Sequence, residues 1–375
     1  MTINFILDGI GTSGGIRMVF NLANYLAGQG HTVGIYNPVK KTSKVGIYHS
    51  RRLTEIAKTL KHFIFIDRFG LRKIPFPHNF PIHFVKSLKP KNINNADIII
   101  ATACKTAFEI ARYPKSKGKK FFFIQDFEDW CNPPNTALAS WRLPLKAIVT
   151  CKHLAHMYKQ NTGKKPFAIV PCGIEEKFFR YKAKKNQAKF LLRAKETSED
   201  GSCQPRRLTK TVILMIYNSA WRKGGDDGIK TLKIVKQKFP NIKIILFGID
   251  KKIKQFKSWA KIYYFPSQKR IIKLYHNAGI FVFPSRREGF GLPGLEALAG
   301  QCALVTTDVG AVREYSKHNH SSLISPPKNP QKLAQNIIYL LKNLEEIERL
   351  SENGFKKALE YKLKKMGKNF EKTLY

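Results

Sequence analysis

The most informative stretch of this chain is the run Gly279-Ile-Phe-Val-Phe-Pro-Ser285, followed after two arginines by Glu288-Gly-Phe-Gly-Leu-Pro-Gly-Leu-Glu296. The apolar run predicts a short buried strand that ends at a proline turn. The residues from Leu295 onward have helix-forming composition, so the two carboxylates lie in a strand-to-helix loop and in the first turns of the helix. The glycines between them leave backbone N–H groups uncovered at a helix N-terminus, where a negative ligand is favoured.

The two glutamates add a second kind of recognition to this loop. A carboxylate does not bind phosphate, but it accepts hydrogen bonds from hydroxyl groups. An anion-binding loop flanked by two hydroxyl acceptors matches the groups of a sugar nucleotide, and we expect Glu288 and Glu296 to belong to such a site.

Short apolar runs alternate with amphipathic helical segments through both halves of the chain. Strands are predicted over residues 3–7, 32–36, 98–101, 121–124, 147–150 and 168–170, and over 212–216, 242–247, 262–265, 280–283 and 303–306. Helices are expected between them, for example over 15–27, 154–161, 227–238 and 331–343. Such alternation is typical of βαβ units, so we expect an α/β protein with two doubly wound domains of parallel sheet.

The domain boundary is expected in a polar, basic stretch between the two series of strands. Residues 181–210 predict a linker or insertion between a first domain of residues 1–180 and a second of residues 211–375. Residues 344–375 are helical in composition, and we allow for a last helix that returns to the first domain.

The amino-acid composition limits the cellular compartment and the binding partners that we expect for this protein. At 375 residues with 43% hydrophobic content, the chain fits a globular protein of two domains. With 67 Lys and Arg against 26 Asp and Glu, the net charge of +41 suggests a polyanionic neighbour: nucleic acid, an anionic membrane surface or a phosphate-rich substrate. The six cysteines show no metal spacing and predict reduced thiols. No stretch is apolar enough for a membrane span, so we expect a cytoplasmic protein with peripheral membrane contact.

A glycine-rich segment follows the first predicted strand, at Leu7-Asp-Gly9-Ile-Gly11-Thr-Ser-Gly14-Gly15. It contains a G-x-G-x-x-G pattern, but the second strand ends in Asn37-Pro38 without the acid that a dinucleotide site needs for its ribose. A nicotinamide oxidoreductase is therefore disfavoured. We expect Gly14 and Gly15 to let the backbone approach a ligand phosphate at the start of the next helix.

Two further loops carry candidate residues. Tyr217-Asn-Ser-Ala-Trp-Arg222-Lys223-Gly-Gly225 follows the first strand of the second half, where two cations beside glycines could neutralise a diphosphate. Phe121-Phe-Phe-Ile-Gln125-Asp126-Phe-Glu-Asp-Trp130 places carboxylates and a glutamine at the end of a strand, where they would meet substrate hydroxyls, and Trp130 could stack on a sugar. No arrangement typical of a metal site is present, and no metal or other cofactor is expected.

Together these motifs resemble glycosyltransferase family 4, a group of retaining enzymes with the GT-B fold. The resemblance runs from the Gly14-Gly15 loop through Ile169-Val-Pro171-Cys-Gly173-Ile174 to Glu288 and Glu296, and its most specific part is Phe283-Pro-Ser285-x-x-Glu288-Gly-Phe-Gly-Leu-Pro-Gly-Leu-Glu296-Ala297. It implies two Rossmann-like domains whose parallel sheets face each other across a cleft, the second binding the donor nucleotide.

The resemblance also implies roles for single residues. Glu296 would bind the ribose hydroxyls of the donor, and the backbone amides of Phe290, Gly291 and Leu292 would meet its sugar and diphosphate. Glu288 would lie near the reacting sugar.

The cation loop departs from the family pattern at one position. Lys223 matches the family's diphosphate-binding lysine, with Gly15 facing the donor phosphates. Many members carry an arginine five positions before that lysine, where this chain has Asn218, and we expect Arg222 to supply the charge.

A second departure concerns the acceptor side. Many members carry a His-Asp pair where this chain has Gln125-Asp126, and glutamine takes up no proton. Glutamine at this position looks like the branch that includes rhamnosyltransferases. Glu288, Asp126 and Gln125 are the catalytic candidates.

The expected function is transfer of a hexosyl or deoxyhexosyl group from a nucleoside-diphosphate sugar to a saccharide or lipid-linked saccharide, in the synthesis of a surface polysaccharide or lipopolysaccharide, at the inner face of the cell membrane. Three alternatives stay open: a sugar-nucleotide epimerase of the same fold, a basic protein that binds nucleic acid, and a non-catalytic module of the same fold. The paired glutamates disfavour the first, and the absence of a recognisable nucleic-acid motif disfavours the second.

Overall fold

The computed structural model describes residues 1–39, 74–130, 133, 135–180 and 211–375. The predicted linker over 181–210 lies outside these residues. The described chain divides into two compact units: residues 1–148, 166–168 and 370–375 form the first, and residues 149–165 and 169–369 form the second.

The first unit is built on a sheet with the order β3-β2-β1-β4-β5-β6-β7. Its strands are β1 (Thr2–Ile6), β2 (Thr32–Pro38), β3 (Ile82–Val85), β4 (Ile98–Ala101), β5 (Lys119–Ile124), β6 (Lys146–Val149) and β7 (Ala168–Ile169). The pairs β1–β2, β2–β3, β1–β4 and β4–β5 are parallel. All four residues of β4 are buried, as expected for a strand covered on both faces.

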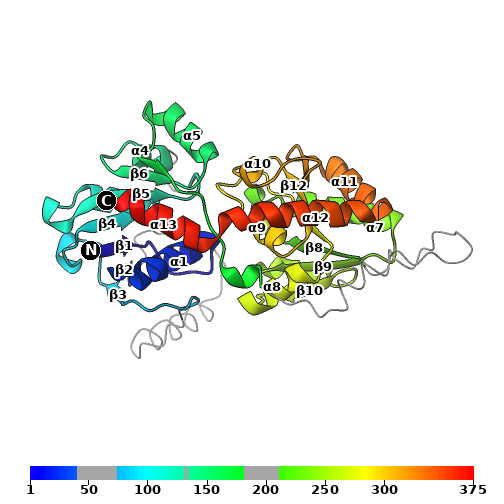
Figure 1. Ribbon diagram of the computed structural model, residues 1–375, viewed down its shortest axis with the longest axis horizontal. Coiled ribbons are helices and arrows are strands. Elements are labelled where there is room, and N and C mark those ends of the chain that lie inside the picture. Colours follow the sequence, from blue (N-terminus) through cyan, green and yellow to red (C-terminus); the bar gives the residue numbers. More distant parts are fainter. Residues whose placement is uncertain (40–73, 131–132, 134, 181–210) are drawn as a thin grey trace, which may run out of the picture. The chain divides into compact units, whose positions relative to one another are not determined.

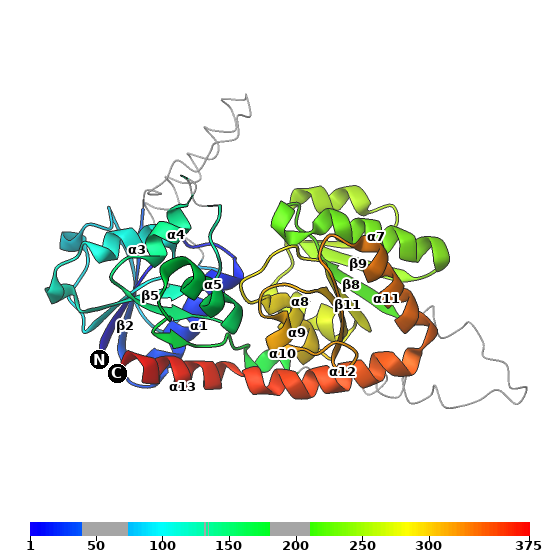
Figure 2. The same ribbon diagram turned by 90° about the horizontal axis from the view of Figure 1, so that it is seen from above.

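Helices α1 (Gly14–Gly28), α3 (Cys104–Ala111) and α4 (Thr136–Trp141) accompany this sheet. The last helix, α13 (Leu363–Leu374), lies beside α1 (Figures 1 and 2), and Phe370 completes the core of the first unit. The Phe370 ring lies 6.3 Å from that of Phe5 and 5.3 Å from that of Phe123. In the same unit, Glu371 accepts a 2.9 Å hydrogen bond from His31.

The second unit repeats this plan with the strand order β10-β9-β8-β11-β12-β13. Its strands are β8 (Val212–Ile216), β9 (Lys243–Gly248), β10 (Lys261–Tyr264), β11 (Ile280–Phe283), β12 (Ala303–Thr307) and β13 (Ser322–Ser325). Every neighbouring pair in this sheet is parallel. The prediction of two parallel-sheet, Rossmann-like domains is confirmed.

The helices of the second unit include α5 (Lys152–Thr162), α7 (Gly225–Lys238), α8 (Gln268–His276), α9 (Leu292–Ala299), α10 (Val312–Tyr315), α11 (Pro330–Lys342) and α12 (Leu344–Ala358). Figures 1 and 2 show α11 beside α7, where Thr231 donates a 3.1 Å hydrogen bond to the carbonyl of Pro330. Among the helices of the described ranges, none is both long and apolar enough to cross a membrane.

Candidate active site

The site of the second unit lies where its sheet changes winding direction. Strands β8 and β11 are neighbours in the sheet although they are far apart in the chain. In open parallel sheets, ligands bind at the carboxyl ends of the strands at such a switch point. The loop with Arg222 and Lys223 follows β8, and the loop with Glu288 follows β11, so both predicted loops open at one place.

Lys223 and Glu288 form the central contact of this site. The Lys223 ammonium donates to both carboxylate oxygens of Glu288, at 2.7 and 2.9 Å, and the Ser285 hydroxyl donates a third bond at 2.8 Å. The Glu288 side chain is 6% exposed and that of Lys223 is 26% exposed. The lysine therefore neutralises a buried carboxylate while its ammonium stays within reach of solvent.

Backbone contacts hold the two loops together. The amides of Arg286 and Arg287 donate to the carbonyl of Arg222, at 2.8 and 3.0 Å. Gly224 has a φ of +60°, and a Cβ built on it would lie 1.9 Å from the carbonyl oxygen of Pro284. Only glycine fits this approach, which brings the lysine loop against the glutamate loop.

Arg286 stabilises the same region through an ion pair with Asp227, which the sequence did not predict. Its guanidinium donates two hydrogen bonds of 2.7 Å to the buried carboxylate of Asp227, and this hydrogen bonding raises the pKa of Arg286. The guanidinium also lies 5.4 Å from the ring centre of Trp221. No motif marks this pair, because both residues resemble surface charges until the fold places them together.

The N-terminus of α9 forms the floor of the predicted donor loop. Gly291 precedes the helix with a φ of +85°, and Leu292 is its first residue. Phe290 is buried and stacks on Tyr315 at 5.6 Å, while the Tyr315 hydroxyl donates a 3.0 Å hydrogen bond to the carbonyl of Gly291. Burial raises the pKa of Tyr315 well above its usual range, with a further contribution from Glu288. Tyr315, which the sequence did not single out, fixes the loop that presents the amides.

Glu296 lies within α9 and is 4% exposed. The hydroxyl of the buried Tyr275, on α8, donates a 3.1 Å hydrogen bond to its Oε2 atom. This bond fixes the carboxylate that the sequence assigns to the ribose, and a carboxylate can accept further hydrogen bonds from hydroxyl groups.

Asn218 serves the loop itself. Its side-chain oxygen accepts a 2.8 Å hydrogen bond from the amide of Ala220. The amide of Ser219, between these two residues, donates a 2.8 Å hydrogen bond to Asp250. Asn218 thus stabilises the turn that leads to Arg222 and Lys223.

A further group of aromatic and cationic side chains lies at β10 and the start of α8. Phe265 is 60% exposed with a φ of +51°, and the guanidinium of Arg270 lies 5.5 Å from the ring centre of Tyr263. Gln268 is held by Glu175, to which it donates at 2.9 Å, and by Lys177, from which it accepts at 2.7 Å. These contacts give the segment a defined aromatic and cationic surface.

The candidate residues of the first unit gather at the carboxyl edge of its own sheet. Gly14 opens α1, and Ser13 caps it by accepting a 3.3 Å hydrogen bond from the amide of Ile16. A Cβ on Gly15 would lie 3.5 Å from the side-chain oxygen of Gln125, so the structure brings these two predicted residues together. Asp126 follows, and its Oδ1 atom accepts a 2.9 Å hydrogen bond from the amide of Phe127.

Glu128 is a residue of this edge whose importance the sequence left open. Its carboxylate accepts a 2.8 Å hydrogen bond from the amide of Cys104 at the start of α3. Burial is the largest cause that raises the pKa of Glu128, and the nearby carboxylates of Asp126 and Asp8 also raise it. The Cys104 amide and Lys105 lower it, and the resulting pKa is about 7. Trp130, the proposed stacking platform, is 53% exposed.

The cysteine expectation needs one correction. Cys104 is disulfide-bonded, whereas Cys151, Cys172 and Cys302 are free and buried. The prediction of reduced thiols is therefore wrong for Cys104. No group of three or more His, Cys, Asp or Glu side chains in the described part of the chain is arranged to hold a metal ion.

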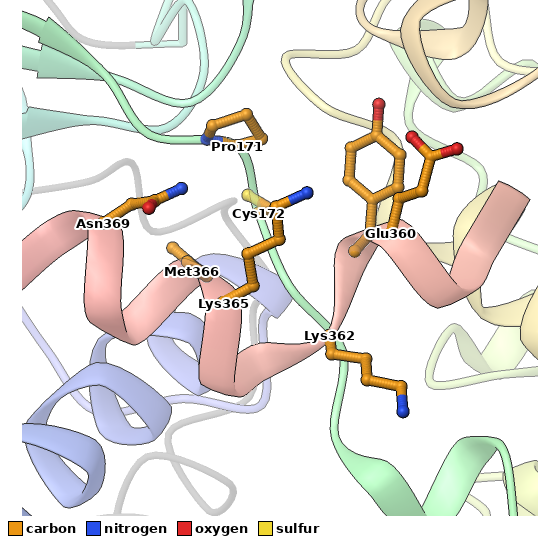
Figure 3. Close-up of a pocket in the computed structure, with 8 residues that line it drawn as sticks. Pro171, Cys172, Glu360, Lys362, Lys365, Met366 and Asn369 are labelled. Atoms are coloured by element: carbon orange, nitrogen blue, oxygen red, sulfur yellow. The ribbon is translucent and has the colours of Figure 1, made fainter.

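A small cavity of about 120 Å³ lies in the second unit beside the start of α13. It is lined by Pro171, Cys172, Glu360, Tyr361, Lys362, Lys365, Met366 and Asn369, and Figure 3 shows Lys362 and Lys365 extending in opposite directions from the helix. Residue 173 beside this cavity must be a glycine, because a Cβ on it would lie 2.8 Å from the Cα of Leu363. None of the predicted site residues lines this cavity.

Comparison with known proteins shows which family the second half of the chain is similar to. Residues 200–357 match the family model described as Glycosyl transferases group 1. This segment is similar to group 1 glycosyltransferases. The matched segment carries Lys223, Glu288 and Glu296, and with its two parallel-sheet units the chain has the GT-B fold.

Relatives of this chain share limited sequence identity with it. The N,N'-diacetylbacillosaminyl-diphospho-undecaprenol alpha-1,3-N-acetylgalactosaminyltransferase of Campylobacter jejuni is 29% identical over 156 residues, which are 40% of this chain and 41% of that protein. The chain thus matches less than half the length of this relative. The uncharacterized glycosyltransferase YqgM of Bacillus subtilis is 23% identical over 66% of this chain and 75% of its own.

Solved structures agree on the fold. The crystal structure of HepE from Anabaena in complex with UDP has a TM-score of 0.73 and 13% sequence identity, covering 100% of this chain and 99% of that one. At this level of identity the likeness establishes the GT-B fold and nothing finer.

Proposed function

We propose that this chain is a retaining glycosyltransferase of family 4 type, which transfers a hexosyl or deoxyhexosyl group from a nucleoside-diphosphate sugar to a saccharide or lipid-linked saccharide. The observation that carries this proposal is the bidentate contact between Lys223 and Glu288 at the switch point of the second sheet, beside the N-terminus of α9. It unites a cation for a diphosphate, a carboxylate for a sugar and an open helix end in one site.

The donor would be held by groups of the second unit. The Lys223 ammonium, together with Arg222, would neutralise the diphosphate, and the helix end at Gly291 and Leu292 would add backbone N–H donors. Glu296, fixed by Tyr275, would accept the ribose hydroxyls. These groups form a charge-neutralising set without a metal ion, and we propose that none is required.

The reaction would break the bond between the anomeric carbon and the phosphate oxygen through an oxocarbenium-like state. An acceptor hydroxyl would then attack from the face that the nucleotide leaves and would give its proton to the departing diphosphate, so that the anomeric configuration is retained. Catalysis would rest on positioning and on stabilising the negative charge that develops on the diphosphate. Glu288 would stand beside the reacting sugar, and Gln125 and Asp126 would serve the acceptor side.

The named relatives support the substrate classes. The name of the Campylobacter jejuni relative contains a diphospho-undecaprenol acceptor, and HepE was crystallised with UDP. We therefore propose a role in surface polysaccharide synthesis, from the cytoplasmic side of the membrane.

Donor binding tests the proposal directly. Titration calorimetry with UDP, GDP, dTDP and ADP and their sugar derivatives should show one preferred nucleotide. Glu296→Gln should weaken its binding by about 1–3 kcal/mol, because an amide is an imperfect partner for two hydroxyls. The exposed Glu352→Gln is a matched control that should bind as the unaltered protein does. Equal affinities for the two variants would remove Glu296 from the donor site, and absence of nucleotide binding would overturn the function.

A further inference from the structure

A second concave surface lies at the opposite edge of the first sheet, where β4, β5 and β6 begin. It encloses about 570 Å³ and is lined by Ala96, Asp97, Lys115, Gly118, Lys119, Lys120, Pro144 and Lys146. We refer to these residues as the lysine pocket. Four of them are lysines and one is an acid, so the pocket concentrates positive charge in a chain that is already strongly basic.

The lysines of the pocket differ in how they are used. The Lys120 ammonium donates to the carbonyls of Ala111, at 3.1 Å, and Tyr113, which fixes it in place. Lys115 and Lys119 are exposed, and within the described residues their ammonium groups have no hydrogen-bond or ion-pair partner. Two cations therefore face the pocket without compensation.

The single acid of the pocket is already engaged. An oxygen of Asp97 accepts a 2.7 Å hydrogen bond from the amide of Thr2. Its negative charge is directed to the backbone, so the pocket keeps an excess of positive charge for a ligand to neutralise.

The floor of the pocket is fixed by close backbone packing. Gly118 has a φ of +101°, and a Cβ on it would lie 2.5 Å from the carbonyl oxygen of Ala96. The next amide, of Lys119, donates a 2.8 Å hydrogen bond to the carbonyl of Asp97. A residue other than glycine would push the two loops apart, so the spacing of Lys115 and Lys119 is set by the fold.

The pocket is separate from the candidate residues of the same unit. Gln125 follows the carboxyl end of β5, whereas Lys119 is its first residue. At about 3.3 Å per residue, the strand puts roughly 17 Å between the two edges. The lysine pocket is thus a site of its own.

An aromatic side chain stands next to the pocket. Phe167 is 51% exposed, and the ammonium of Lys146 lies 4.6 Å from its ring centre. Exposed aromatic rings beside lysines are typical of surfaces that meet a lipid headgroup region.

We propose that the lysine pocket binds phosphate groups that together carry two or more negative charges. Two sources share this chemistry: the headgroups of anionic lipids, and free phosphate compounds. The inference stands apart from the proposed sugar transfer, because it uses neither Lys223 nor Glu288.

The test compares two double variants of the full chain. The pocket variant carries Lys115→Gln and Lys119→Gln. The control variant carries Lys230→Gln and Lys233→Gln, which replace two exposed lysines on α7. Both pairs remove the same charge, and both are made in a Lys223→Gln background so that the donor site contributes equally little. The probes are inorganic pyrophosphate, followed by calorimetry, and phosphatidylglycerol vesicles, followed by sedimentation. The melting temperature of each variant confirms that it is folded.

The pocket variant should bind at least one probe roughly tenfold more weakly than the α7 control. An equal loss in both pairs, no loss in either, or no binding of either probe by the parent would overturn the proposal. Phe167→Ala identifies the source. Weaker vesicle binding with unchanged pyrophosphate binding assigns the lipid, and unchanged binding of both assigns the free compound. With Lys223 intact, the pocket variant should keep its nucleotide binding, which separates this inference from the proposed function.

Discussion

The contact between Lys223 and Glu288 makes an asymmetric prediction about stability. Lys223→Gln leaves the carboxylate of Glu288 in a site that is 6% exposed, where the Ser285 hydroxyl is its one remaining partner among the residues that the structure describes. Breaking a buried ion pair costs about 3–5 kcal/mol, and because Lys223 is 26% exposed we expect a smaller loss of about 2–3 kcal/mol. For a domain of this size, that loss lowers the melting temperature by about 4–12 °C.

The reverse change should cost less. In Glu288→Gln the lysine is left without its partner, but its ammonium reaches water, and the amide keeps the hydrogen bond of Ser285. We expect a loss of about 1 kcal/mol, within the range for partly exposed pairs. The double variant should be more stable than the sum of the two losses implies, by at least about 1 kcal/mol.

The free energy of unfolding is measured by urea denaturation at pH 7 for the unaltered protein, the two single variants and the double variant, which together form a double-mutant cycle. Nucleotide titration of the same four proteins then shows whether the stability changes accompany changes in binding. Losses that add to within about 0.5 kcal/mol would refute the argument that Lys223 neutralises a buried Glu288. A larger loss for Glu288→Gln than for Lys223→Gln would refute the assignment of burial to the carboxylate.

Three other residues give independent tests. Tyr275→Phe removes the hydroxyl that holds Glu296 and should weaken nucleotide binding about fivefold in calorimetry; it should also lower the melting temperature by a few degrees, because the carboxylate that loses this hydrogen bond is buried. The folded-state pKa of Glu128, about 7, lies above its ordinary value of 4.5, so this residue lowers the free energy of unfolding as pH rises from about 4.5 to 7; Glu128→Gln should flatten that slope in urea melts at several pH values. Gly224→Ala places a Cβ against a backbone carbonyl and should lower stability by several kcal/mol, whereas Gly11→Ala, with open space around it, should melt within a few degrees of the unaltered protein.

The periodicity of the apolar runs was enough to predict most of the sheet framework. The strands over 98–101, 212–216 and 280–283 have the predicted bounds, because each is a continuous apolar run. Strand β3 was missed because its Ile82-His-Phe-Val85 sequence is short and only partly buried. Strand β13 was missed because serines stand at both ends of its four residues.

The site was predicted one residue at a time, but not as a set of contacts. Lys223 and Glu288 were each chosen from their own loop, and nothing in the sequence says that their side chains meet. Their contact depends on the pairing of β8 with β11, which brings distant loops together. Tyr275 and Tyr315 were not predicted, because a tyrosine among apolar residues has the same local pattern whether or not its hydroxyl holds a functional group.

Helix α13 has a consequence for the order in which the chain can fold on the ribosome. Domains generally fold as they emerge, with the first-made domain folding first. Here the aromatic core around Phe5 and Phe123 is completed by Phe370, which is translated after the whole of the second unit. Until then, a newly made first unit exposes the apolar surface that Phe370 will cover. The half of the protein that is synthesised first is therefore the half whose core is finished last.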